Sequence, residues 1–478
     1  MSNTTASSAR QRIDSLLDAN SFVEIGGQVT ARSTDFNLTA KETPSDGVIT
    51  GYGVIDGNLV YVYSQDASVL GGTIGEMHAK KIVRLYETAM KTGAPVIGLV
   101  DCAGLRLQEA TDALNGFGDI YRAMSDASGV VPQITALFGT CGGGMALIPA
   151  LTDFTFMEEK NAKLFVNSPN AIAGNIDSKC DTSSAKFQSE ETGLVDYVGS
   201  EADILGQMRA LVSMLPSNFE DDLDYEDSSD DLNRACSDLA NCIGDTAILL
   251  AQISDNGTFF ESKKMYGTDM VTAFIKLNGT TVGAVANRSE SYDTEGNVVF
   301  QSEAVLSARG AEKAAEFVEF CDAFSIPVLT ITNVKGFKAS KCSEKKMAKA
   351  VAKLTYAFAN ATTSKVNVIT GAAYGSAYLA MNSKSTGADM VYAWSDAQIG
   401  MMDAKSAAKI MYEGTDAATI NEKAAEYATL QNSVMSAARR GYVDTIIDPV
   451  DTRKYVIGAF EMLFTKRENR PDKKHGTV

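Results

Sequence analysis

Histidine is nearly absent from this sequence, because only His78 and His475 occur among 478 residues. Two histidines leave little possibility of a catalytic Ser-His-Asp or Cys-His group, or of a metal site built on imidazole. The seven cysteines form no C-x-x-C pair, which argues against a zinc ribbon or a thioredoxin-like motif. We therefore expect no metal site and no chemistry that needs a protein histidine.

Positive charge and long apolar runs are also scarce. The chain has 43 lysines and arginines against 60 aspartates and glutamates, a net charge of −17, whereas a nucleic-acid partner requires clustered cations. No run approaches the roughly 20 apolar residues of a membrane span. The first residues, MSNTTASSARQRID, lack the apolar stretch of a secretory signal. These features predict a cytoplasmic protein with reduced thiols, no nucleic-acid partner and no inserted membrane segment.

What the sequence does contain is an internal repeat. Residues 80–101 align with 312–333, and residues 132–147 align with 364–379, both at an offset of 232. Both pairs place apolar runs over apolar runs, and the second places glycine over glycine. A constant offset across both pairs indicates a duplication.

Each half alternates helical and strand patterns. The apolar positions of 82–90 recur at helical spacing, whereas stretches such as 95–101 are short apolar runs typical of buried parallel strands. The strongly acidic stretch 216–231 is typical of a linker, because it cannot bury apolar area. We therefore predict an α/β protein of two similar layered domains, 1–225 and 226–478.

Glycines follow a predicted strand in each half. FGTCGGGMALIP, residues 138–149, places three of them before a helical pattern, and VITGAAYGSAYLA, residues 368–380, is the matching stretch of the second half. Glycine lets the backbone approach a ligand, and the first N–H groups of a helix are unpaired and partly positive. Each half is therefore predicted to bind an anion, or to stabilise a negative charge that forms during a reaction.

A purely structural role would also account for a single glycine loop, since close packing of a helix on a strand requires small residues. Repetition of the loop at the same offset favours a ligand. A nucleotide loop does not fit, since G-x-x-x-x-G-K-[ST] is absent and G-x-G-x-x-G is not met. Cys141 is predicted to fill space rather than act as a nucleophile, because no histidine is assured nearby. His78 is predicted to be a capping or packing residue.

Five stretches carry a resemblance to a known family: 46–82, 93–110, 127–157, 313–337 and 368–384. In order, they resemble the carboxyltransferase subunits of biotin-dependent acyl-CoA carboxylases, transcarboxylases and sodium-pumping decarboxylases. The resemblance implies two tandem crotonase-like domains of the ClpP/crotonase superfamily. It also implies a homo-oligomer, a dimer or a trimer of dimers, with active sites between the N-terminal domain of one subunit and the C-terminal domain of another.

The resemblance further implies what each domain binds. The N-terminal domain is expected to hold an acyl-CoA thioester, with Gly143 and Gly144 as donors to its oxygen. The C-terminal domain is expected to hold biotin, with Ser376 and Ala377 as donors to its ureido oxygen. Other residues expected at these sites are Gly71, Gly72, Gly104, Arg106, Gly142, Tyr374, Gly375 and Leu379.

The implied reaction moves CO2 between biotin on a separate carrier protein and the alpha carbon of a short acyl-CoA. Propionyl-CoA and methylmalonyl-CoA are the expected pair, and the cofactor serves as the base. The chain has no M-K-M biotin-attachment motif, so a biotin carrier protein and a biotin carboxylase or membrane decarboxylase subunit are expected partners. The acetyl/malonyl and glutaconyl/crotonyl pairs are the alternatives to this acyl pair.

Some stretches depart from the family pattern. Cys102 and Ala103 replace Ser and Gly, residues 289–298 form an insertion, and the loop 334–354 lacks the usual proline, second glycine and Gln-Glu pair. The altered loop leaves open a catalytically impaired CoA-binding scaffold of a decarboxylase complex. A crotonase-type hydratase or hydrolase on CoA esters is a further alternative, for which no good carboxylate pair is evident.

Overall fold

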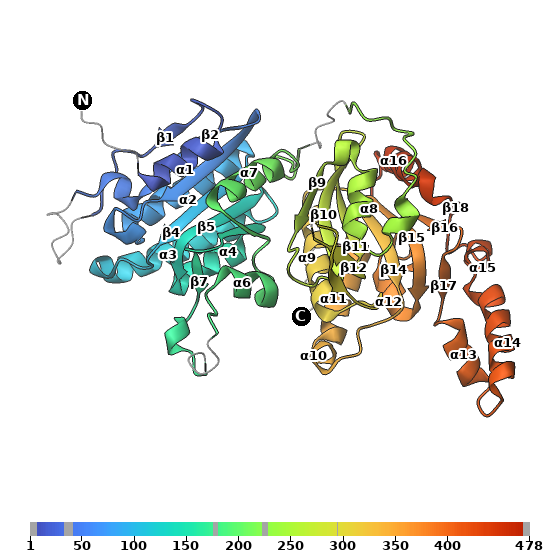
Figure 1. The fold of residues 1–478 in the computed structure, drawn as a ribbon. Helices are drawn as coiled ribbons and strands as arrows, with labels where there is room; N and C mark the ends of the chain where they lie inside the picture. Colours follow the sequence, from blue (N-terminus) through green and yellow to red (C-terminus); the bar gives the residue numbers. More distant parts are fainter. Residues whose placement is uncertain (1–6, 33–41, 175–179, 222–227, 294, 472–478) are drawn as a thin grey trace. The chain divides into compact units, whose positions relative to one another are not determined.

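The computed structural model describes residues 7–32, 42–174, 180–221, 228–293 and 295–471 (Figure 1). The chain separates into two compact units, Met1–Asp222 and Leu223–Val478. Each unit is built on one eight-stranded sheet. The predicted domain boundary at residue 225 lies outside the described residues and remains a prediction.

The first sheet has the strand order β1-β2-β3-β4-β5-β6-β8, with β7 paired to β5. Strand β2 pairs with β1 and β3 in antiparallel fashion, and the other pairs are parallel. The strands are β1 (Val23–Ile25), β2 (Val48–Ile55), β3 (Asn58–Gln65), β4 (Val96–Cys102), β5 (Gln133–Gly142), β6 (Phe154–Glu158), β7 (Lys163–Phe165) and β8 (Tyr197–Gly199). The α-helices are α1 (Ser8–Leu16), α2 (Glu76–Thr92), α3 (Ala110–Ala127), α4 (Leu147–Leu151), α6 (Ala185–Phe187) and α7 (Glu201–Val212).

The second sheet repeats this plan in the order β9-β10-β11-β14-β15-β16-β18, with β17 paired to β15. Its strands are β9 (Phe259–Ser262), β10 (Met270–Leu277), β11 (Thr280–Asn287), β14 (Val328–Val334), β15 (Lys365–Tyr374), β16 (Met390–Trp394), β17 (Gln398–Gly400) and β18 (Thr445–Ile447). The α-helices are α8 (Thr246–Ile253), α9 (Ala308–Ala323), α10 (Lys341–Glu344), α11 (Met347–Asn360), α12 (Gly375–Ala380), α13 (Ala404–Met411), α14 (Ala417–Tyr427), α15 (Val434–Arg439) and α16 (Thr452–Leu463). A separate hairpin of β12 (Glu290–Tyr292) and β13 (Val298–Gln301) overlaps the predicted insertion, 289–298.

The two sheets confirm the predicted duplication. Strands β4 and β14 begin and end 232 residues apart, and so do β5 and β15. The register between these strands shifts at the same point in both units, between Val100 and Cys102 and between Thr332 and Val334. The predicted α/β class with two similar domains is therefore correct.

Helix α2 shows why the predicted pattern folds as it does. Its buried face includes Ile82, Leu85, Tyr86 and Ala89, whose spacing matches the turn of an α-helix. Gly93 follows the last helical residue with φ +65°, the left-handed conformation that glycine adopts without strain. This confirms the predicted helix and its end.

A buried lysine recurs at the same position in both units. In the second unit the Lys313 ammonium lies 2.8–3.0 Å from the carbonyl oxygens of Lys263, Tyr266 and Met270. Its side chain is buried, with 1% of the residue exposed. Lys81, 232 residues earlier, donates in the same way to two carbonyls at and before the start of β2. Each ammonium therefore ties the loop before a strand to the helix that covers it.

We predict that Lys313→Met lowers the free energy of unfolding by about 2–4 kcal/mol, because three carbonyls, two of them in buried hydrogen bonds, lose their donor while the side-chain volume is nearly kept. Urea denaturation measures the change. The neighbouring exposed Lys264→Met is the control and should leave stability unchanged. Equal stability of the two variants would contradict this role for Lys313.

Candidate functional site

The two glycine loops have the same backbone conformation. Gly143 has φ +64° and Gly375 has φ +61°, both in the left-handed region. The preceding residues, Gly142 and Tyr374, are extended and end β5 and β15. A helix begins at each glycine: the short helix η5 (Gly143–Ala146), followed directly by α4, and helix α12. The strand, glycine and helix therefore follow one another in both units, as predicted.

These helix starts present free backbone donors. Gly143 and Gly144 are the first residues of η5, and Ser376 and Ala377 are the second and third residues of α12, so their N–H groups have no partner inside the helix. Gly144 and Ser376 are exposed, Gly143 is half-buried and Ala377 is buried. Apart from its chain neighbours and the backbone of its own helix, no described atom lies within 4 Å of the position that a Cβ of Gly143 would take. Each loop can thus donate N–H groups to a ligand oxygen that approaches the start of its helix.

An exposed leucine follows each loop by one helical turn. Leu147 is 45% exposed and Leu379 is 42% exposed, and the two are 232 residues apart. Leu379 is one of the predicted site residues. Leu147 is not, although the offset alone could have found it. Each set of donors therefore has an apolar side chain next to it, as a ligand with a polar atom on an apolar body requires.

Tyr121 restrains the first glycine loop through a hydrogen bond. Its hydroxyl donates to the carbonyl oxygen of Gly144 over 2.6 Å, which restrains the backbone of this loop. Tyr121 lies in α3, far from the loop in sequence, and no motif marks it. In the second loop the Tyr374 hydroxyl donates to Gln398. Both loops are therefore restrained by a tyrosine, though from different positions.

Three predicted site residues outside the first loop, Gly71, Gly72 and Gly104, lie close to strand β4 and, through Gly104, to Gly142 of that loop. A Cβ on Gly72 would come within 2.3 Å of a backbone oxygen in 101–103, and the Gly71 carbonyl accepts an N–H bond from the same stretch. Gly104 has φ +108°, and the carbonyl oxygen of Gly142 lies 4.0 Å from where its Cβ would be. The structure thus brings these four glycines together. Their contact with CoA remains a prediction.

Arg106 is the centre of a buried ion-pair cluster. Only 1% of it is exposed. One guanidinium nitrogen lies 2.6 Å from the Asp46 carboxylate and 2.8 Å from that of Glu109, and the other donates to the Thr73 carbonyl over 2.8 Å. A guanidinium with these bonds positions the surrounding loops, and its predicted contact with CoA remains a prediction.

The two carboxylates of this cluster cap helix α2. Glu109 accepts the backbone N–H of Glu76 over 2.6 Å, and Asp46 accepts that of His78 over 2.8 Å. Gly75, which precedes the helix, has no side chain to do this. Carboxylates at a helix start satisfy free N–H groups and are attracted by the helix dipole. Burial raises the pKa of Asp46, so the positive charge of Arg106 is needed to keep it ionised.

We predict that Arg106→Met destabilises the chain by about 3–5 kcal/mol, because two buried carboxylates lose their counter-charge. Label exchange from an acyl-CoA should fall together with stability. The exposed Arg32→Met, which also breaks ion pairs with carboxylates, is the control. An increase in KM for the acyl-CoA at unchanged stability would instead show that Arg106 contacts the substrate.

His78 and Cys141 are packing residues, as predicted. The His78 ring is fully buried, with Nδ1 3.0 Å from the Asp46 carbonyl oxygen and Nε2 3.2 Å from the Gln65 amide nitrogen. Burial lowers the pKa of His78 to about 3. Burial also raises the pKa of the Cys141 thiol well above its usual range. Neither group is available to act as a base or a nucleophile near pH 7.

The low pKa of His78 predicts a loss of stability in mild acid. Below pH 6.5 the unfolded chain binds a proton at this ring and the folded chain does not, down to a pKa of about 3. Stability should therefore fall by about 2 kcal/mol between pH 7 and pH 5 from this group. Urea denaturation of wild type and His78→Gln at both pH values measures it. Equal losses in the two proteins would contradict the assignment.

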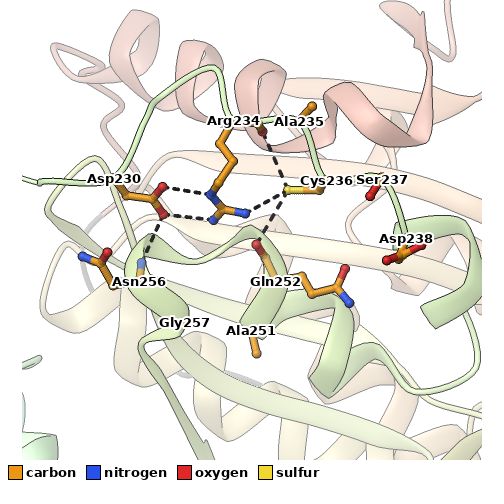
Figure 2. Close-up of a pocket in the computed structure, with 10 residues that line it drawn as sticks. All are labelled: Asp230, Arg234, Ala235, Cys236, Ser237, Asp238, Ala251, Gln252, Asn256 and Gly257. Atoms are coloured by element: carbon orange, nitrogen blue, oxygen red, sulfur yellow. Dashed lines mark hydrogen bonds and ion pairs between the residues drawn. The ribbon is translucent and has the colours of Figure 1, made fainter.

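A pocket of about 450 Å³ lies elsewhere in the second unit (Figure 2). It is lined by residues of 230–238 and 251–257 and contains none of the predicted site residues. The Arg234 guanidinium beside it donates twice to Asp230, over 2.8 and 2.9 Å, and lowers the pKa of that carboxyl to about 2. Its charge is already neutralised, so it is not free to bind an anion.

Comparison with known proteins decides the family. A model of the carboxyl transferase domain matches residues 4–478. The chain belongs to this family. It is 39% identical over 482 residues to the methylmalonyl-CoA decarboxylase subunit alpha of Veillonella parvula, covering 98% of this chain and 92% of the relative. It is 39% identical over 486 residues to the propionyl-CoA carboxylase beta chain of Roseobacter denitrificans, covering 98% and 93%.

A solved structure agrees with this assignment. The hexameric transcarboxylase 12S, crystallised with hydrolysed methylmalonyl-coenzyme A bound, superposes with a TM-score of 0.90 at 36% identity, over 98% of this chain and 92% of its own. The carboxyltransferase resemblance, the crotonase-like fold and the enzyme class are therefore confirmed. In the part of the chain that the structure describes, no helix is both long and apolar enough to cross a membrane.

Proposed function

We propose that this carboxyltransferase moves CO2 between biotin on a separate carrier protein and the alpha carbon of a short acyl-CoA, with propionyl-CoA and methylmalonyl-CoA as the pair. The matched pair of N–H loops carries this proposal, because the reaction develops negative charge on two oxygens, one in each reactant. The names of the relatives, a methylmalonyl-CoA decarboxylase subunit and a propionyl-CoA carboxylase chain, support the acyl group.

The first loop serves the acyl-CoA. As the alpha proton leaves, the thioester oxygen gains negative charge, and the N–H groups of Gly143 and Gly144 donate to it. These donors are fixed by the fold before the reaction, so no reorganisation is needed when the charge forms. Tyr121 keeps the Gly144 backbone in place. Leu147 offers an apolar contact beside the donors.

The second loop is suited to a ligand that has one carbonyl oxygen on an otherwise apolar ring. Residues 374–380 carry no charged side chain, so the N–H groups of Ser376 and Ala377 are the polar donors, and Leu379 lies one turn away. These residues would hold the ureido oxygen and ring of biotin, with Tyr374 and Gly375 shaping the loop. When bound, the carboxylated cofactor supplies both the carboxyl group and the base.

The hydratase alternative requires a carboxylic acid that donates a proton, and Glu76 does not suit this role. Glu76 begins helix α2 in the first unit, and it forms ion pairs of 2.6 Å with Arg32 and 2.7 Å with Lys80. The bond from Lys80 lowers the pKa of Glu76. A carboxylate held ionised in this way is a poor proton donor to a leaving hydroxyl.

The scaffold alternative rests on the altered loop 334–354, whose start is preserved in three dimensions. The Leu306 N–H donates to the Gly336 carbonyl over 2.9 Å, and the Lys338 N–H donates to the Leu306 carbonyl over 2.9 Å. These bonds match, at an offset of 232, the two that Ile74 makes in the first unit. The loop therefore leaves the sheet along the path that its counterpart takes.

The proposal includes the partners of such a subunit. They are a biotin carrier protein and, depending on the direction, a biotin carboxylase or a membrane decarboxylase subunit. A homo-oligomer, either a dimer or a trimer of dimers, would bring the acyl-CoA loop of one subunit to the biotin loop of another. The transcarboxylase 12S hexamer supports this part of the proposal.

Loss of carboxyl label from methylmalonyl-CoA tests the function. We expect loss that depends on added free biotin, because the ring itself is the acceptor. Ser376→Pro removes one N–H donor at a position where the helical φ suits proline and should lower the exchange rate about 10²–10³-fold. Ser376→Ala keeps the N–H group and should retain the rate. No biotin-dependent loss with methylmalonyl-, malonyl- or glutaconyl-CoA would refute the proposal.

A further inference from the structure

Lysines are concentrated in one short segment of this acidic chain. Residues 335–349 carry six lysines and one glutamate, whereas the whole chain has a net charge of −17. We refer to this stretch as the lysine segment. It covers the loop after β14, helix α10 and the start of α11. Its local charge is therefore opposite to that of the protein as a whole.

The charges of the lysine segment are free to act on a partner. All six of its lysines are exposed, namely Lys335, Lys338, Lys341, Lys345, Lys346 and Lys349. In the described residues the structure shows no ion pair for any of them, although it pairs other lysines such as Lys384 and Lys466. Unpaired surface charges set a potential that reaches roughly a Debye length, about 8–10 Å, into solvent.

The lysine segment lies beside the second N–H loop. Its backbone is held by bonds from Lys335 to Ala304 and from Lys338 to Leu306, over 2.7 and 2.9 Å. Helix α11, in which it ends, packs against α12, the helix that begins at Gly375. Figure 1 shows α10, α11 and α12 together in the second unit. Because β14 and β15 run in parallel, the lysine segment leaves the same edge of the sheet as the loop that begins α12.

We propose that the lysine segment is the docking surface for an acidic face of the biotin carrier protein. This inference rests on the proposed function, in which biotin arrives attached to another chain. The acidic remainder of this chain repels such a carrier, so the lysine segment determines where it approaches. Flexible ammonium groups suit a broad, exposed protein contact, where opposite charge raises the association rate.

The test compares two triple variants. Lys341, Lys345 and Lys349 are changed to Gln in one, and the exposed Lys91, Lys186 and Lys264 are changed to Gln in the other. The probe is a biotinylated carrier domain with acidic residues around its biotinyl lysine, together with a version in which these residues are replaced by their amides. Direct binding of the probe, exchange with the probe and exchange with free biotin are all measured.

In the test variant, we expect the dissociation constant and the KM for the acidic probe to rise about tenfold at low salt. The effect should shrink as salt is added, and it should be absent with the amide version. Exchange with free biotin should be unchanged, since the free ring needs no docking. The control variant should match wild type in every measurement.

Three results would overturn the inference. Unchanged binding of the acidic probe would mean that the lysines do not dock it. An increase in the KM for methylmalonyl-CoA instead would mean that they hold the phosphates of CoA. Loss of free-biotin exchange together with thermal stability would mean a structural role. Wild type that binds the probe without any free-biotin exchange would count against the proposed function and not against docking.

Discussion

The structure depends on one arrangement: a strand ends, one residue turns with positive φ, and a helix begins. Gly143 and Gly375 make this turn with nearly equal angles. The turn directs the first N–H groups of the helix away from the sheet, where a ligand oxygen can reach them. Because the donors belong to the backbone, the sequence around them can vary widely while the chemistry persists. This explains a carboxyltransferase with almost no histidine.

The two units cap the helix that precedes β4, and its counterpart that precedes β14, with different side chains. In the first unit the buried Arg106 holds two carboxylates that cap helix α2. In the second unit the corresponding helix α9 is capped by Ser307, the residue before it, which accepts the Gly310 N–H over 3.0 Å and itself donates to Asp269. The lysines at 81 and 313 are alike in both. The backbone plan is thus retained more closely than the polar contacts around it.

Much of this can be predicted from the sequence, because the offset of 232 and the glycine loops are local patterns. The resemblance to carboxyltransferases adds the assignment of each loop to a reactant. Tyr121 carries no such signal, since it acts from a distant helix, whereas Leu147 could have been found from Leu379 by the offset. The burial of Arg106 is also not evident from the sequence, because its partner Asp46 is 60 residues away. The departures in the loop 334–354 lead us to consider a loss of biotin binding, whereas the hydrogen bonds at the start of this loop match those of the first unit.

The most direct measurement is a crystal structure of the protein with a CoA ester and biotin bound. The account predicts the thioester oxygen within about 3.1 Å of the Gly143 and Gly144 nitrogens, and the ureido oxygen equally close to those of Ser376 and Ala377. A thioester or ureido oxygen bound by side chains, or by any other helix start, would contradict it.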